Sequence, residues 1–232
     1  MPDHEGSFSP VLTPVLGYIA LRRLIGVLGL FLPFVLWAGG AWLFGTRLQP
    51  TISDYHGTGM RDVFVGIMVS LAVFLFTYRG QDGLENWSTN VAGLFAAGVA
   101  WFPNEGGAKA VHYLCASLFF AILALVALFL FPRLQPGDRR TSGKLRRNGI
   151  YRFCGIAMLA CIALILLRQP LADLGIPAMG YGNIVFFLEA GVVVFFGVAW
   201  LVKGEALRLP VLRSAFSYFT KEGVASPPPT LP

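Results

Sequence analysis

The chain has 232 residues, of which 56% are hydrophobic and only 13% are charged, with a mean hydropathy of +0.67 and a net charge of +6. Soluble globular domains carry about 25% charged residues. This composition therefore excludes an ordinary soluble domain and directs attention to the distribution of the apolar residues.

Six apolar runs follow one another along the chain, each near the length of a membrane-crossing helix. A bilayer core of about 30 Å takes roughly 20 apolar residues per helix. The runs are apolar all round, whereas a helix on a soluble core pairs an apolar face with a polar one. They cover residues 24–45, 62–78, 89–102, 110–131, 150–167 and 183–202. The sequence predicts an all-α, polytopic membrane protein built as a bundle of six transmembrane helices.

The segments outside the runs have a different composition. Residues 1–23 contain three prolines and are expected to be irregular or interfacial, followed by the transmembrane domain at 24–203. Residues 204–232 are expected to form a short amphipathic segment on the inner membrane surface and a disordered proline-rich tail. The first run is expected to be a retained helix rather than a signal peptide, because Asp3 and Glu5 precede it and Arg22 and Arg23 come late.

The basic residues are distributed asymmetrically between alternate loops. With a cytoplasmic N-terminus, the inner segments hold fourteen Lys and Arg residues and the outer segments hold four, namely Arg47, Arg61, Lys109 and Arg168. This asymmetry follows the positive-inside rule, and it predicts a plasma (inner) membrane protein of bacterial type with both termini in the cytoplasm. The basic loop after residue 132 is interpreted as a topology anchor beside anionic lipid. It lacks interleaved aromatic residues, so no nucleic acid is expected as a partner.

Ionisable residues at membrane depth are candidates for function because they are costly to place there. In the predicted topology, polar residues of three separate helices lie on the outer side. The candidate ligand-binding residues are Asp54, Tyr55, His56, Arg61, Asp62, His112 and Glu189. Glu189 lies about six residues into the last run, which is about 9 Å deep at 1.5 Å per residue.

Three uses of this outer cluster remain open. The leading hypothesis is a non-enzymatic site that binds or passes a small solute or lipid, with Arg61 pairing an anionic headgroup. The second is a zinc site formed by Asp54, His56 and His112, since zinc takes nitrogen and oxygen ligands and activates water for hydrolysis. The third is a purely structural cap in which Asp54 or Asp62 pairs with Arg61.

Two further features guide the expected packing. Glycine and alanine at 93, 96, 97 and 100 give the third run a small-residue stripe, which favours close helix approach and a central place in the bundle. On the inner side, a polar patch that includes Tyr78, Asp82 and Glu85 is expected to form a hydrated turn. Lys203 is expected to pair locally with Glu205.

The stretches SDYHGTGMRDVFVG (53–66) and GLFAAGVAWFP (93–103), with His112 and the terminal WLVKGE (200–205), resemble a bacterial family of six-helix membrane proteins, the Frag1/DRAM-like grouping. The resemblance covers residues 24–205 and implies fold and location without an activity. A fainter similarity is to the membrane hydrolases that include alkaline ceramidases and adiponectin-receptor-like proteins, which use a Ser, Asp and three-His zinc site on seven helices. That similarity implies a metal-dependent lipid hydrolase in which Ser53, Asp54, His56 and His112 would act, although the chain has no closing HxxxH and no seventh run.

Overall fold

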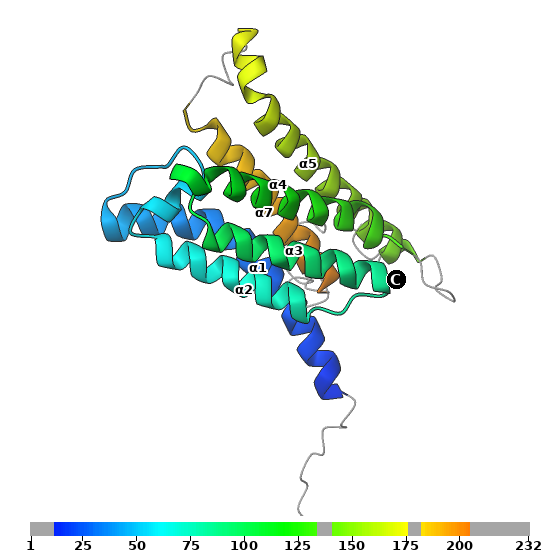
Figure 1. Cartoon of the computed structure of the whole chain (residues 1–232). Coiled ribbons are helices and arrows are strands. Elements are labelled where there is room, and N and C mark those ends of the chain that lie inside the picture. The colour runs from blue at the N-terminus through cyan, green and yellow to red at the C-terminus, as the bar shows by residue number, and fades with distance from the viewer. Residues whose placement is uncertain (1–11, 134–140, 176–181, 205–232) are drawn as a thin grey trace, which may run out of the picture.

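The computed structural model describes residues 12–133, 141–175 and 182–204, and in these ranges the chain is helical without strands (Figure 1). Each of the six predicted apolar runs is a helix. The helices are α1 (Leu12–Phe44), α2 (Arg61–Thr77), α3 (Gly83–Trp101), α4 (Lys109–Leu125), α5 (Ser142–Asp173) and α7 (Ile184–Lys203). A π-helical turn, η3 (Val126–Leu130), continues α4, and the short 3-10 helices η1 (Ser53–Gly57) and η2 (Gly106–Ala108) precede α2 and α4.

The first helix begins earlier than its apolar run. It starts at Leu12 rather than at residue 24, and Pro14 is compatible with this start because it lies in the first turn, where no intrahelical donor is needed. Gly45, with a φ of +59°, ends the helix in the left-handed conformation that glycine adopts without strain. Residues 1–11 and 205–232, which contain most of the expected flanking segments, lie outside the described residues.

The six helices form a closed ring rather than a bundle with one central helix. Each helix from α1 to α5 packs against the next, α7 packs against α5, and the contact between α7 and α1 closes the ring. The expectation that the third run is central is therefore wrong, because α3 lies between α2 and α4 and exposes Leu94 on its outer face. Its small-residue face is nevertheless buried, as expected.

The contact between α1 and α7 depends on glycine. A Cβ on Gly197 of α7 would lie 2.5 Å from the backbone nitrogen of Leu30, and one on Gly26 of α1 would lie 2.8 Å from the backbone nitrogen of Leu201. Such distances are far below normal contact, so only glycine permits this approach. Small residues serve the same purpose in membrane helix pairs generally.

The outer surface of the ring is apolar, and its core lies inside the ring. Large hydrophobic side chains are exposed on every helix, among them Phe31, Val73 and Phe153, where a soluble protein would place mainly polar ones. Four helical stretches are long and apolar enough to cross a membrane: Gly17–Phe44, Gly106–Leu130, Ser142–Arg168 and Ile184–Lys203. The structure is therefore that of an all-helical chain with four candidate membrane spans, and α2 and α3 are not among the four.

Candidate ligand-binding cavity

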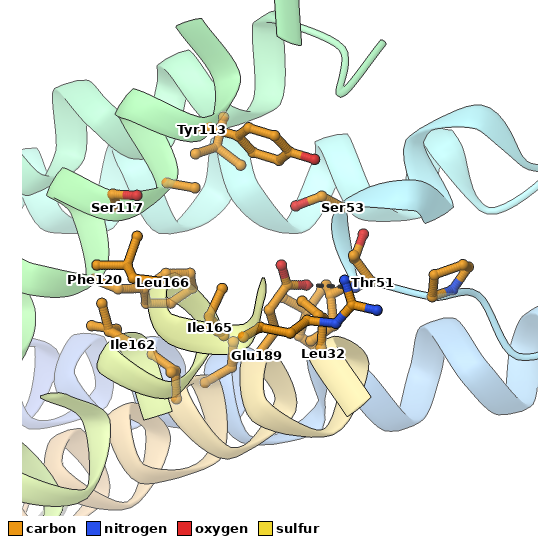
Figure 2. A pocket seen from close by; sticks show the side chains of 18 of the residues that line it. Leu32, Thr51, Ser53, Tyr113, Ser117, Phe120, Ile162, Ile165, Leu166 and Glu189 are labelled. Carbon is orange, nitrogen blue, oxygen red and sulfur yellow. Dashed lines mark hydrogen bonds between the residues drawn. The ribbon is translucent and has the colours of Figure 1, made fainter. Parts of the chain in front are cut away.

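A cavity of about 470 Å³ lies within the ring, toward the end that holds η1 and the start of α7. Its walls come from α1, α2, α3, α4, α5 and α7, so it depends on the ring being closed. Most of the lining is apolar, and Phe120, Ile162 and Leu166 form part of the wall between α4 and α5 (Figure 2). Its volume falls in the range of about 300–1,000 Å³ that is typical of small-molecule sites.

Most of the polar groups of the cavity gather toward one side, while Ser117 lies apart from them on the side of Phe120. Figure 2 shows Thr51, Ser53 and Glu189 near one another, with the Tyr113 hydroxyl on the same side, whereas Phe120 and Ile162 lie across the cavity. This distribution gives the cavity an apolar part and a polar part. Such a division suits a ligand that is itself amphiphilic.

Glu189 lines the cavity inside the ring, and it also has a structural contact. Its Oε2 accepts a hydrogen bond of 2.6 Å from the backbone N–H of Ile52, which precedes η1. One turn earlier, the backbone N–H of Phe186 donates to the carbonyl of Pro50 at 2.8 Å. Together these bonds dock the segment before η1 on the first turns of α7.

Arg168, near the end of α5, is the cationic group of the cavity lining. Its Nε is buried and has no hydrogen-bond partner among the described residues. No ion pair joins it to Glu189, which lies on another wall. Arg168 was counted in the sequence only as an outer basic residue, because its position at the end of an apolar run gave no sign that the residue lines a cavity.

His112 and His56 are both buried beside the cavity in the cap formed by η1 and the start of α4. The Nδ1 of His112 lies 2.7 Å from the carbonyl oxygen of Phe102, so Nδ1 carries the proton in the neutral ring. The Nε2 atoms of the two rings have no partner in the part of the chain that is described. His112 is close enough to His56 and Asp54 for both to act electrostatically on its ring.

Other members of the predicted cluster lie apart from the cavity. Asp54 accepts a hydrogen bond of 2.8 Å from Asn104, so its partner is a neutral amide. Arg61 and Asp62 are exposed at the start of α2, and neither forms an ion pair with a described residue. The predicted structural cap, in which Arg61 pairs with an aspartate, is therefore not formed among the described residues.

Tyr55 is fully buried, with its ring centroid 6.2 Å from that of Phe186. Burial raises the pKa of its phenol above the ordinary value, so the group stays neutral. Tyr55 packs η1 onto α7 and does not line the cavity.

The described residues contain no group of three or more His, Cys, Asp or Glu side chains placed to hold a metal ion. Two imidazoles with free Nε2 atoms and one amide-bonded carboxylate do not make a zinc site of the usual four-coordinate kind. The zinc hydrolase remains a prediction that these contacts do not support.

The opposite end of the ring is closed by a buried ionic network that the sequence did not predict. Glu85 of α3 lies 3.1 Å from Lys203 of α7, and both side chains are almost completely buried. The Tyr78 hydroxyl donates to Glu85 at 2.5 Å, and the backbone N–H of Gln81 donates to its other oxygen at 3.0 Å. The expectation of a hydrated turn is therefore wrong for Glu85 and Tyr78. The expected partner Glu205 lies outside the described residues.

Aromatic rings enclose this network. The Lys203 ammonium lies 4.5 Å from the centroid of the Phe131 ring, and Trp200 packs edge-on against both Tyr78 and Phe131, at 4.8 and 5.4 Å. Arg22 of α1 adds a cation–π contact with Tyr78 at 5.4 Å. The network thus joins α1, α3 and α7 with the residues that directly follow α2 and η3, and it fills the interior of the ring at this end.

Comparisons with family models, with curated proteins and with solved structures find no match for this chain. The resemblances of the sequence to known families therefore remain predictions.

Proposed function

We propose that this chain is an integral membrane protein of six transmembrane helices that binds a small amphiphilic molecule, a lipid or lipid-like solute, in the cavity within the ring. The observation that carries the proposal is the cavity of about 470 Å³, whose walls are largely apolar and most of whose polar groups gather on one side. Clefts of this size with a few placed polar groups are the usual form of ligand sites.

The proposal counts α2 and α3 as the two remaining spans. They have 17 and 19 residues, which correspond to about 26 and 28 Å at 1.5 Å per residue, close to the bilayer core of about 30 Å. Trp87 and Trp101, near the two ends of α3, are 71% and 82% exposed. Tryptophan is enriched at both membrane interfaces, so their positions support a span between them.

Binding is favoured over passage by what lies at the two ends of the ring. The cavity occupies one end, while the ion pair of Glu85 and Lys203 and the aromatic rings around it fill the other. A solute that entered the cavity would meet this packed layer. The proposed site is therefore a binding pocket on the side that the charge distribution assigns to the outside.

Photocrosslinking in membranes tests the proposal. An oleoyl amphiphile that carries a diazirine in its chain should label buried residues of the cavity wall such as Met68 and Val192. Ala116→Trp, which places an indole in the cavity wall, should reduce that labelling at least tenfold. Ala110→Trp is the matched control, because Ala110 is exposed on the same helix and does not line the cavity. Labelling confined to outward residues such as Leu114 and Phe153 would contradict the proposal.

A further inference from the structure

We infer that the ligand of this cavity carries an anionic group, a carboxylate or a phosphate, which is bound by Arg168. This inference rests on the proposed function and names the chemical class of its ligand. The ligand would be an amphiphile whose hydrocarbon chain lies against the apolar walls and whose headgroup reaches the end of α5.

The first support is the state of the Arg168 guanidinium. An arginine side chain is always charged in a protein, and buried charges are normally paired. The Nε of Arg168 is shielded from solvent, yet it makes no hydrogen bond to any described residue. The ion pairs found in the described ranges, Arg133 with Asp82 and Lys203 with Glu85, do not involve it. The half-buried guanidinium of Arg168 therefore lines the cavity without a carboxylate partner among the described residues.

The second support is that the acidic side chain of the same cavity, Glu189, already has a hydrogen-bond partner. Glu189 accepts a hydrogen bond of 2.6 Å from the backbone N–H of Ile52. This bond holds the segment before η1. Glu189 forms this contact and no ion pair with Arg168. An anionic group on a molecule that enters the cavity would give the guanidinium the partner that the described residues do not provide.

The third support is the surroundings of the guanidinium. Its planar fork binds carboxylate or phosphate through two parallel hydrogen bonds. The hydroxyl groups of Thr51, Ser53 and Tyr113 also line the cavity, and each can donate to the remaining headgroup oxygens. The apolar side chains of Phe64, Met68 and Val192 line the rest of the wall and suit a hydrocarbon chain.

The test is a comparison of three ligands that share one oleoyl chain. Oleate carries a carboxylate, oleoyl lysophosphatidate carries a phosphate, and monoolein is uncharged. Their dissociation constants are measured on the full-length protein in a neutral detergent. The wild-type protein should bind at least one anionic ligand tenfold or more tightly than monoolein, and the stronger of the two identifies the headgroup.

Arg168→Gln should remove this preference while monoolein still binds, and Arg168→Lys should retain part of it. Arg47→Gln is the matched control, because Arg47 is exposed on the same side of the ring and does not line the cavity. Equal affinities for the three ligands in the wild type, or an unchanged preference in Arg168→Gln, would overturn the inference. Monoolein binding that Ala116→Trp abolishes would still leave the proposed function standing, whereas failure of all three ligands to bind would overturn both.

Discussion

The buried pair of Glu85 and Lys203 is the contact that most strongly constrains the ring at the residue scale. Their side chains are only 2% and 6% exposed, so removing either charge leaves the other buried without compensation. Breaking such a pair typically costs about 3–5 kcal/mol, whereas replacing both partners by apolar residues costs much less. This asymmetry distinguishes a desolvated pair from a solvent-screened surface pair.

Glu85→Gln should therefore lower the free energy of unfolding by about 3–5 kcal/mol, because Gln still accepts from Tyr78 but leaves the Lys203 ammonium unpaired. The double variant Glu85→Gln with Lys203→Met should recover a large part of that loss. Unfolding in mixed detergent micelles measures both. A double variant that is less stable than the single one would contradict this account of the network.

The dual contact of Glu189 leads to a second prediction. Glu189→Leu removes the acceptor of the Ile52 N–H and should lower the free energy of unfolding by about 1–3 kcal/mol. Glu189→Gln keeps an oxygen at that position, so its effect should be much smaller. Thermal unfolding of the two purified variants shows whether Glu189 acts as a hydrogen-bond acceptor or must carry a charge. Equal losses of stability in the two variants would argue against the acceptor role.

Part of the cavity could be predicted from single residues. Glu189 was found because a carboxylate inside an apolar run is costly, and that argument requires no knowledge of neighbours. Arg168 could not be found in this way, because a cation at the end of a run is usually an interfacial residue. The polar stretch that contains Arg61 and Asp62 predicts that both belong to the site, but the start of α2 turns them outward. Which face of a helix a residue occupies depends on packing.

At the scale of elements, the glycine contact between α1 and α7 determines how the ring closes. Gly197→Ala should lower the free energy of unfolding by about 1–3 kcal/mol, the usual cost of overpacking, because its Cβ would lie 2.5 Å from a backbone atom of Leu30. Gly66→Ala is the matched control, since Gly66 of α2 has open space around it. That change should be neutral or stabilise the helix by about 0.5–1 kcal/mol. Equal effects of the two substitutions would show that the close approach does not matter.

Helix existence could be predicted from the apolar runs, but helix ends could not. The third run was expected to begin at residue 89, yet α3 begins at Gly83, because Asp82 caps it by accepting from the N–H of Glu85 at 2.8 Å. That bond is also the main reason that the pKa of Asp82 is lowered. An Asp three residues before a Glu is a capping signal in the sequence. This signal predicts that Glu85 lies inside a helix, where its side chain can contact neighbouring helices.

For the whole molecule, the ring explains why an apolar chain retains an internal cavity. The six described helices pack mainly each against two neighbours and leave a space between them, and the residues at each end decide whether it is filled. At one end Trp200, Phe131 and Tyr78 pack around the buried ion pair. At the other, the side chains that line the space leave room for a ligand. Hydropathy alone predicts the helices but not this closure, because closure depends on contacts between residues far apart in sequence.

The orientation of the ring decides from which side the cavity is reached. By the positive-inside rule, the fourteen basic residues assigned to the inner segments predict that the end with Glu85 and Lys203 faces the cytoplasm. In a variant whose three native cysteines are replaced, Ser142→Cys, exposed at the start of α5, should resist a membrane-impermeant thiol reagent in intact cells and react after permeabilisation. Glu105→Cys is the control, since it is exposed at the opposite end of the ring and should react without permeabilisation. The reverse pattern would place the cavity on the cytoplasmic side and would make an intracellular amphiphile its ligand.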